Sequence, residues 1–309
     1  MMDYSNTRYP NPFNKFLSFF RQGSALSSLI IINVAVWILI QLIKVILFLY
    51  NKPDGSLAIN WVFHNLALPA SLPVLLSEPW TLFTYMFLHI EFWHLLFNML
   101  WLYWFGRIFR EFLSSRKLVT VYLLGGITGG LVYIFAFNLF PVFSSVVRDA
   151  FALGASAAVM AIVSAISFYA PTYSIQLLFF GRVRILYLAI ILFVFDFFMI
   201  PTGNAGGHLA HIGGALFGLI YALALRNSNI SRDPSSFFTN FKTKFSSKSN
   251  GYQTTSGNYG RPFSDDEYNI RKKEKENRID KILEKISRGG YDSLTKEEKD
   301  FLFKTSNKN

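Results

Sequence analysis

Residues 207–225 read GHLAHIGGALFGLIYALAL, a run of apolar and small residues that is interrupted by two histidines. As a helix this stretch would be about 29 Å long, which is close to the hydrocarbon thickness of a membrane. Five further apolar stretches precede it, at residues 28–50, 91–109, 118–140, 154–170 and 184–200. The pattern predicts an all-α, polytopic membrane protein with six transmembrane helices.

The overall composition supports this class. Of the 309 residues, 52% are hydrophobic and only 16% are charged, and the mean hydropathy is +0.32. Because soluble domains carry about a quarter charged residues, a water-soluble enzyme is disfavoured. The net charge is +11, and the basic residues of the apolar part at 1–225 mostly lie between apolar runs, so we expect a lipid bilayer as the partner and no nucleic acid. The chain has no cysteine, which excludes thiolate metal sites and a cysteine nucleophile.

Basic residues also predict the orientation, because they concentrate on the cytoplasmic side of membrane proteins. The connection at 106–117 is strongly basic, and Arg182 and Arg184 precede the fifth span. The N-terminal segment and the tail are basic as well. We therefore expect both termini in the cytoplasm, with the connection at 51–80 lying partly in the outer interface.

The charge pattern also divides the chain into regions. We expect a cytoplasmic N-terminal segment at 1–27, a six-span domain at 28–225, a flexible linker at 226–262 and a small soluble helical hairpin at 263–309. In the hairpin, apolar residues recur at helical spacing, Gly289 and Gly290 end the first helix, and Ser293 can cap the second. The apolar residues are Ile279, Ile282, Leu283, Ile286, Leu294, Phe301 and Leu302. So small a hairpin buries little by itself, and we expect it to bind an unidentified cytoplasmic partner.

Two spans carry residues suited to nucleophilic catalysis. Ser156 follows a small-residue turn at the start of the fourth span, where helix amides can receive negative charge. His211 in the sixth span is a candidate general base. Each residue lies 14 positions from the cytoplasmic end of its span, so both lie roughly 21 Å above the inner face. Gly214 and Gly218 follow His211 on one face and would allow close helix packing, which is also the structural alternative for these residues.

A second polar group lies at the start of the second span. His94 and Asn98 are four residues apart, so both side chains can donate hydrogen bonds to an oxyanion from one helix face. His89 does not complete the spacing of a zinc protease, and we expect no metal and no cofactor. An interfacial cluster without function is the alternative. Asp196 in the fifth span is expected to make a structural hydrogen bond, with no identified partner.

Taken in chain order, His89-xxxx-His94-xxx-Asn98, Gly154-x-Ser156 and Ala210-His211-xx-Gly214-xxx-Gly218 resemble the rhomboid family of intramembrane serine proteases. The resemblance implies a six-helix bundle that cleaves transmembrane protein substrates with a Ser156/His211 dyad. It also implies that His94 and Asn98 help to bind the oxyanion. Around these groups we expect supporting roles for Gly154, Met160, His89 and His208.

Two departures from the family pattern affect this interpretation. Ala157 stands where glycine is usual, and Met160 stands where an aromatic residue is common. Neither change removes a reacting group, so we favour an active serine endopeptidase in a bacterial inner membrane. The alternatives are a catalytically inactive rhomboid-like protein that binds transmembrane clients, and a small transporter whose path includes His94, Asp196 and His211.

Overall fold

The structure is a computed structural model that describes residues 20, 23–50, 56–177 and 181–227, together with parts of 279–302. The chain divides into two compact units, at 1–247 and 248–309, which are described separately. The expected segment at 1–27 and the expected linker at 226–262 lie almost entirely outside the described residues.

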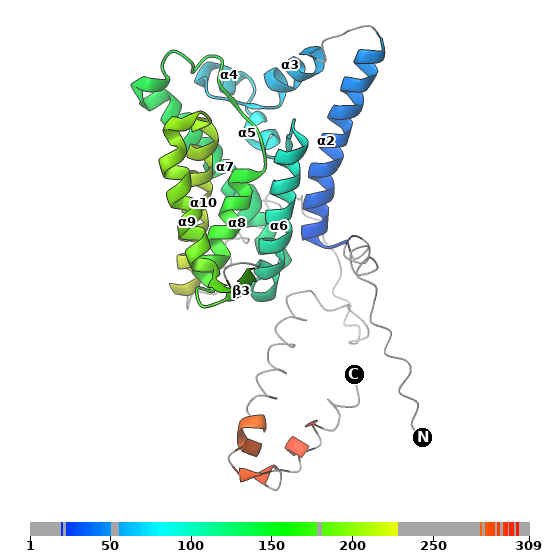
Figure 1. Ribbon diagram of the computed structural model, residues 1–309, viewed down its shortest axis with the longest axis vertical. Helices are drawn as coiled ribbons and strands as arrows, with labels where there is room; N and C mark the ends of the chain where they lie inside the picture. The colour runs from blue at the N-terminus through cyan, green and yellow to red at the C-terminus, as the bar shows by residue number, and fades with distance from the viewer. Residues whose placement is uncertain are drawn as a thin grey trace, which may run out of the picture. The chain divides into compact units, whose positions relative to one another are not determined.

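Each of the six predicted spans is a helix in the first unit (Figure 1). The helices are α2 (Ala25–Leu49), α6 (Phe92–Phe112), α7 (Ser115–Leu139), α8 (Ser156–Tyr169), α9 (Ile185–Met199) and α10 (Ala205–Asn227). Four of them, α2, α7, α9 with its following turn, and α10, are long and apolar enough to cross a membrane by themselves. Helix α8 is shorter, at 14 residues, and the last turns of α6 contain charged residues. The predicted all-α class and polytopic membrane character are confirmed.

Local sequence explains where these helices begin. Ser24 caps α2, because its hydroxyl oxygen accepts a hydrogen bond from the Ser27 amide at 3.2 Å. Ser114 caps α7 in the same way, with the Lys117 amide as donor at 3.3 Å. Only residues 113 and 114 separate α6 from α7, so the chain reverses direction there and the two helices are neighbours in sequence and in space.

The long connection between α2 and α6 is structured. It contains α3 (Ser56–Asn65), β1 (Leu68–Pro69), α4 (Leu72–Ser77), α5 (Thr81–Thr84) and the 3₁₀ turn η1 (Tyr85–Phe87). Figure 1 shows α3 and α4 at the end of the helix bundle opposite to β3. Strand β1 pairs antiparallel with β2 (Phe151–Ala152), with Leu68 opposite Ala152. This pairing ties the connection to the residues that lead into α8.

The short strands are a difference from the sequence analysis, which predicted none. Besides β1 and β2, an antiparallel pair joins β3 (Ser174–Leu177) to β4 (Gly181–Arg184) between α8 and α9. Each strand has two to four residues, which is too short for an alternating pattern to be recognised.

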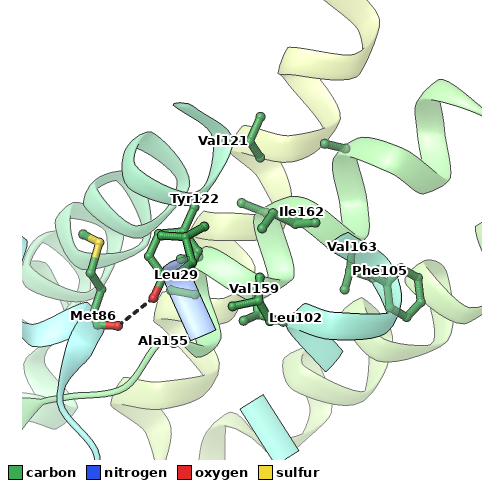
Figure 2. Close-up of a cluster of buried hydrophobic side chains, with 14 of the residues drawn as sticks. Leu29, Met86, Leu102, Phe105, Val121, Tyr122, Ala155, Val159, Ile162 and Val163 are labelled. Atoms are coloured by element: carbon green, nitrogen blue, oxygen red, sulfur yellow. Dashed lines mark hydrogen bonds between the residues drawn. The ribbon is translucent and has the colours of Figure 1, made fainter. Parts of the chain in front are cut away.

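Helix α8 lies at the centre of the bundle and is buried over most of its length. Figure 2 shows its residues Val159, Ile162 and Val163 in the buried cluster that also includes Leu102 and Phe105 of α6. In the same cluster the Tyr122 hydroxyl of α7 donates a hydrogen bond to the Met86 carbonyl at 3.0 Å (Figure 2). By contrast, many apolar side chains of α2 and α9 are exposed, as expected for surfaces that face lipid.

Helices α8 and α10 pack through small residues, as predicted. A Cβ atom at Gly214 would overlap the carbonyl oxygen of Ala157, and one at Gly218 would overlap that of Ala161. In addition, the Ser164 hydroxyl donates a hydrogen bond to the Ala215 carbonyl at 2.7 Å. The backbones therefore approach so closely that only glycine fits at the two contact positions of α10.

In the second unit, residues 282–287 are helical and Gly290 has a φ of +74°, which ends this helix as predicted. The expectation that Ser293 caps the second helix is wrong. Thr295 and Glu298 form a reciprocal capping box, with side-chain to amide distances of 2.8 and 3.3 Å. The Ser293 hydroxyl instead donates to the Gly290 carbonyl at 2.6 Å.

Candidate active site

The segment that leads into α8 is held by two backbone hydrogen bonds. The Gly154 amide donates to the Tyr85 carbonyl at 2.9 Å, and the Ala155 amide donates to Nε2 of His89 at 3.3 Å. Both acceptors belong to the chain just before α6. The start of α8, and with it Ser156, is therefore fixed against the start of α6.

Gly154 is required by both its backbone and its surroundings. Its φ is +121°, a conformation that side chains disfavour. A Cβ atom at this position would lie 2.8 Å from Cε1 and 2.9 Å from Nε2 of His94, and 3.8 Å from Oγ of Ser156. The imidazole of His94 and the hydroxyl of Ser156 thus both lie close to the same glycine.

Ser156 is the first residue of α8 and is half-buried. The first amides of a helix have no acceptor within the helix, and the helix dipole makes this end attractive to negative charge. The Ser156 hydroxyl therefore lies beside both an imidazole and a set of amide donors.

His89 contacts the loop that precedes Ser156, through the Ala155 amide. Its side chain is fully buried, and its ring lies 5.1 Å from that of His94 between centroids. Burial, with the neighbouring His94, lowers the pKa of His89 to about 3, so the ring is neutral and its Nε2 can accept the Ala155 amide. His89 thus holds the residue that precedes Ser156, and its supporting role in the site stays a prediction.

Gly129 of α7 lies close to residues of both α8 and α10 that are next to Ser156 and His211 in the sequence. A Cβ atom at Gly129 would lie 2.6 Å from the Cβ of Ala157 and 2.6 Å from the carbonyl oxygen of Ala210. These two residues are the chain neighbours of Ser156 and His211. The two candidate dyad residues therefore lie at one level of the α8–α10 interface, although no hydrogen bond joins their side chains within the described residues.

Asn98 lies one turn after His94 on α6 and is buried. Its Nδ2 donates a hydrogen bond to the His94 carbonyl at 2.9 Å. The amide has a second N–H that this bond does not use. Met160 lies one turn after Ser156 and is half-buried, and its supporting role stays a prediction.

Asp196 hydrogen-bonds with two histidines, which the sequence alone did not identify as its partners. Its Oδ1 accepts hydrogen bonds from Nδ1 of His208 at 2.7 Å and from Nδ1 of His211 at 2.9 Å. The carboxylate is buried in α9, with 6% of its surface exposed. The only signal in the sequence was an acidic residue within an apolar span, which indicates a polar partner without naming it.

Asp196, His208 and His211 are also residue types that commonly bind metal ions. Among the described residues they form a group whose potential ligand atoms lie within 4.8 Å of one another. Their N–O separations of 2.7 and 2.9 Å are typical of hydrogen bonds between a carboxylate and two imidazoles. We therefore describe the group as an Asp196–His208–His211 hydrogen-bond cluster.

A cavity of about 420 Å³ lies at the start of α10, and neither Ser156 nor any residue of the Asp196–His208–His211 cluster lines it. It is lined by residues of the segment at 143–151, by Tyr133 and Phe137 of α7, and by residues 203–206 around the start of α10. The Tyr133 hydroxyl is buried without a hydrogen-bond partner among the described residues. The loop before α8 and the connection after α9 both contribute to its walls, whereas α9 itself does not.

The fold and these residues define a polytopic helical membrane protein with a polar site between its helices. Residues 76–228 match the Rhomboid domain, and residues 264–308 match a family of unknown function, DUF6576. The chain belongs to the rhomboid family.

Two relatives indicate how far this similarity extends. The chain is 33% identical over 144 residues to RHOMBOID-like protein 12, mitochondrial, of Arabidopsis thaliana, which covers 44% of this chain and 43% of that protein. It is 37% identical over 60 residues to Rhomboid protease GlpG of Salmonella newport, which covers 19% of this chain and 22% of the protease. The chain thus matches less than half of the length of either relative.

Proposed function

We propose that this protein is an intramembrane serine endopeptidase that cleaves transmembrane helices of other membrane proteins with Ser156 and His211. The observation that carries the proposal is the contact of Gly129 with the chain neighbours of both residues, Ala157 and Ala210. His94 beside Gly154 and Ser156 adds a donor at the same point. Membership in the rhomboid family supports the same activity.

The reaction would follow serine acyl transfer. His211 takes the proton of the Ser156 hydroxyl while Oγ attacks the scissile carbonyl of a locally unwound substrate helix. The oxyanion accepts hydrogen bonds from His94, Asn98 and the Ser156 amide. When the C–N bond breaks, His211 gives its proton to the leaving amine. His211 then deprotonates a water molecule, which attacks the acyl group and restores the free serine.

The substrate and water need a route to Ser156. The cavity between the loop at 143–151 and the start of α10 supports entry from this end of the bundle, because two connections between helices form part of its walls. Movement of such connections costs less than separation of packed helices. The segments at 141–153 and 200–204 are therefore the proposed gate.

The proposed orientation has both termini in the cytoplasm, here of a bacterial inner membrane. It is supported by basic residues at one end of the first unit, where Arg226 Nη1 donates to the Phe168 carbonyl at 3.2 Å. Cysteines introduced at Arg110 or Arg182 should resist a membrane-impermeant thiol reagent in intact cells, whereas one at Asn204 should react. Reaction at Arg110 and Arg182 but not at Asn204 would reverse the orientation.

Cleavage of a reporter transmembrane helix in proteoliposomes tests the proposal. The wild-type protein should release two fragments, and Ser156→Ala and His211→Ala should release none while keeping their thermal stability. A wild-type protein that binds the reporter without cleaving it would instead be a client-binding member of the family. Cleavage that survives both substitutions would remove the dyad from the mechanism.

A further inference from the structure

We infer that Asp196 is a positioning residue for His211, so that the site operates as a Ser156–His211–Asp196 triad. The inference rests on the proposed protease function and deepens it. It starts from the 2.9 Å hydrogen bond between Nδ1 of His211 and Oδ1 of Asp196.

The two nitrogens of an imidazole lie on opposite sides of the ring, and the neutral ring carries one proton. A carboxylate accepts hydrogen bonds only, so Asp196 keeps the proton of His211 on Nδ1. The lone pair is then on Nε2, which is the nitrogen available to take the proton of a serine hydroxyl. The carboxylate therefore selects the tautomer that a general base requires.

Asp196 also provides charge where the reaction needs it. When His211 accepts the proton of Ser156 it becomes positively charged, and a negative group at 2.9 Å stabilises that charge. Asp196 is 6% exposed, on a helix that otherwise consists of apolar and aromatic residues after Arg184. A carboxylate at such a place is costly unless its partners compensate for the lost water.

His208 acts as the second partner that holds the carboxylate in place. Its Nδ1 lies 2.7 Å from the same oxygen, and its ring lies 6.0 Å from that of His211 at an interplanar angle of 83°. Asp196 is thus fixed by a donor that does not itself take part in proton transfer. His208 lies one turn before His211 on α10. It is therefore farther along the chain than His211 from Ala210, whose carbonyl oxygen lies near Gly129.

A purely structural link between α9 and α10 is the alternative role for these hydrogen bonds. The substitution Asp196→Asn separates the two roles, because the new amide oxygen can accept the same bonds but carries no charge, and the amide can also present an N–H to the ring. A structural link should tolerate this change, whereas a general base should lose both its tautomer and its counter-charge. In soluble Ser-His-Asp proteases the corresponding change lowers turnover by about 10⁴-fold.

The experiment measures kcat and KM for reporter cleavage by the full-length protein and by Asp196→Asn, Asp196→Glu and Ser164→Ala, each with its thermal stability. Ser164→Ala is the matched control, because it removes a buried interhelical hydrogen bond of 2.7 Å without touching either histidine. We expect Asp196→Asn to lose at least about 10-fold in kcat at unchanged KM. Asp196→Glu should retain more turnover than Asp196→Asn, and Ser164→Ala should lose stability but not kcat.

The labelling rate of Ser156 with a fluorophosphonate provides a second readout that needs no substrate helix. It should slow in Asp196→Asn in parallel with kcat, even if part of that variant is unfolded, because the rate is measured on the folded fraction. Equal kcat and labelling rates in Asp196→Asn and wild-type protein would overturn the triad and leave the dyad intact. Wild-type protein that neither cleaves nor labels at Ser156 would instead overturn the proposed function itself.

Discussion

Gly129→Ala places a methyl group between the helices that carry Ser156 and His211. The new Cβ would lie 2.6 Å from both the Cβ of Ala157 and the carbonyl oxygen of Ala210. Nonbonded heavy atoms rest near 3.5 Å, so each neighbour must retreat by about 1 Å. Such overpacking typically costs about 1–3 kcal/mol of stability, and a misplacement of about 1 Å in a catalytic pair can cost about 10²-fold in rate.

Gly126→Ala is the matched control, one turn earlier on the same face of α7. There the new Cβ would lie 2.9 Å from Cε of Met86, the end of a flexible side chain that can move aside. We expect Gly129→Ala to lose about 10²-fold in kcat for reporter cleavage, and Gly126→Ala to keep nearly wild-type turnover. The assay reports kcat, KM and melting temperature in the same detergent. Wild-type kcat in a folded Gly129→Ala protein would refute the argument that the α7 contact sets the distance between Ser156 and His211.

Two further predictions concern the groups around Ser156. Asn98→Ala and His94→Ala should each reduce turnover, and the double variant should reduce it far more. Removal of a single oxyanion donor typically costs about 10²- to 10³-fold, and three donors share the charge here. Wild-type turnover in the double variant would return both residues to a structural role. For His89, the folded pKa of about 3 lies below the unfolded value of about 6.5, so its contribution to stability is complete above pH 6.5 and declines as the pH falls toward 3. His89→Gln keeps an acceptor for the Ala155 amide and does not titrate, so its melting temperature should fall less than that of the wild type between pH 7 and about 4. An identical fall in both proteins would contradict the burial of a neutral His89.

The spans could be predicted from the sequence because a helix in lipid needs a long apolar run, and each run is visible by itself. The small residues after His211 likewise predicted the close contact of α10 with α8, which Gly214 and Gly218 confirm. The short strand β1 could not be predicted, because two residues carry no periodicity and its partner β2 lies more than 80 residues away.

The site was only partly predictable for a related reason. Gly154 and Ser156 stand together in the sequence, but the contact of Gly154 with His94 depends on how α6 and α8 pack. The partners of Asp196 depend on the rotation of α9 about its axis, which an evenly apolar helix does not reveal. In the tail, Thr295 displaced Ser293 as the cap because Glu298, three residues later, completes a capping box with it.

The proposed mechanism depends on Ser156 as the nucleophile, and the residue that a fluorophosphonate modifies identifies the nucleophile. The wild-type protein in proteoliposomes is treated with the probe, digested and analysed by mass spectrometry, while a parallel sample is assayed for reporter cleavage. We predict a single adduct on Ser156, loss of cleavage in proportion to the labelled fraction, and no adduct in Ser156→Ala or within the same time in His211→Ala. Cleavage that continues after complete labelling, or an adduct on another serine that accounts for the loss of activity, would contradict this mechanism.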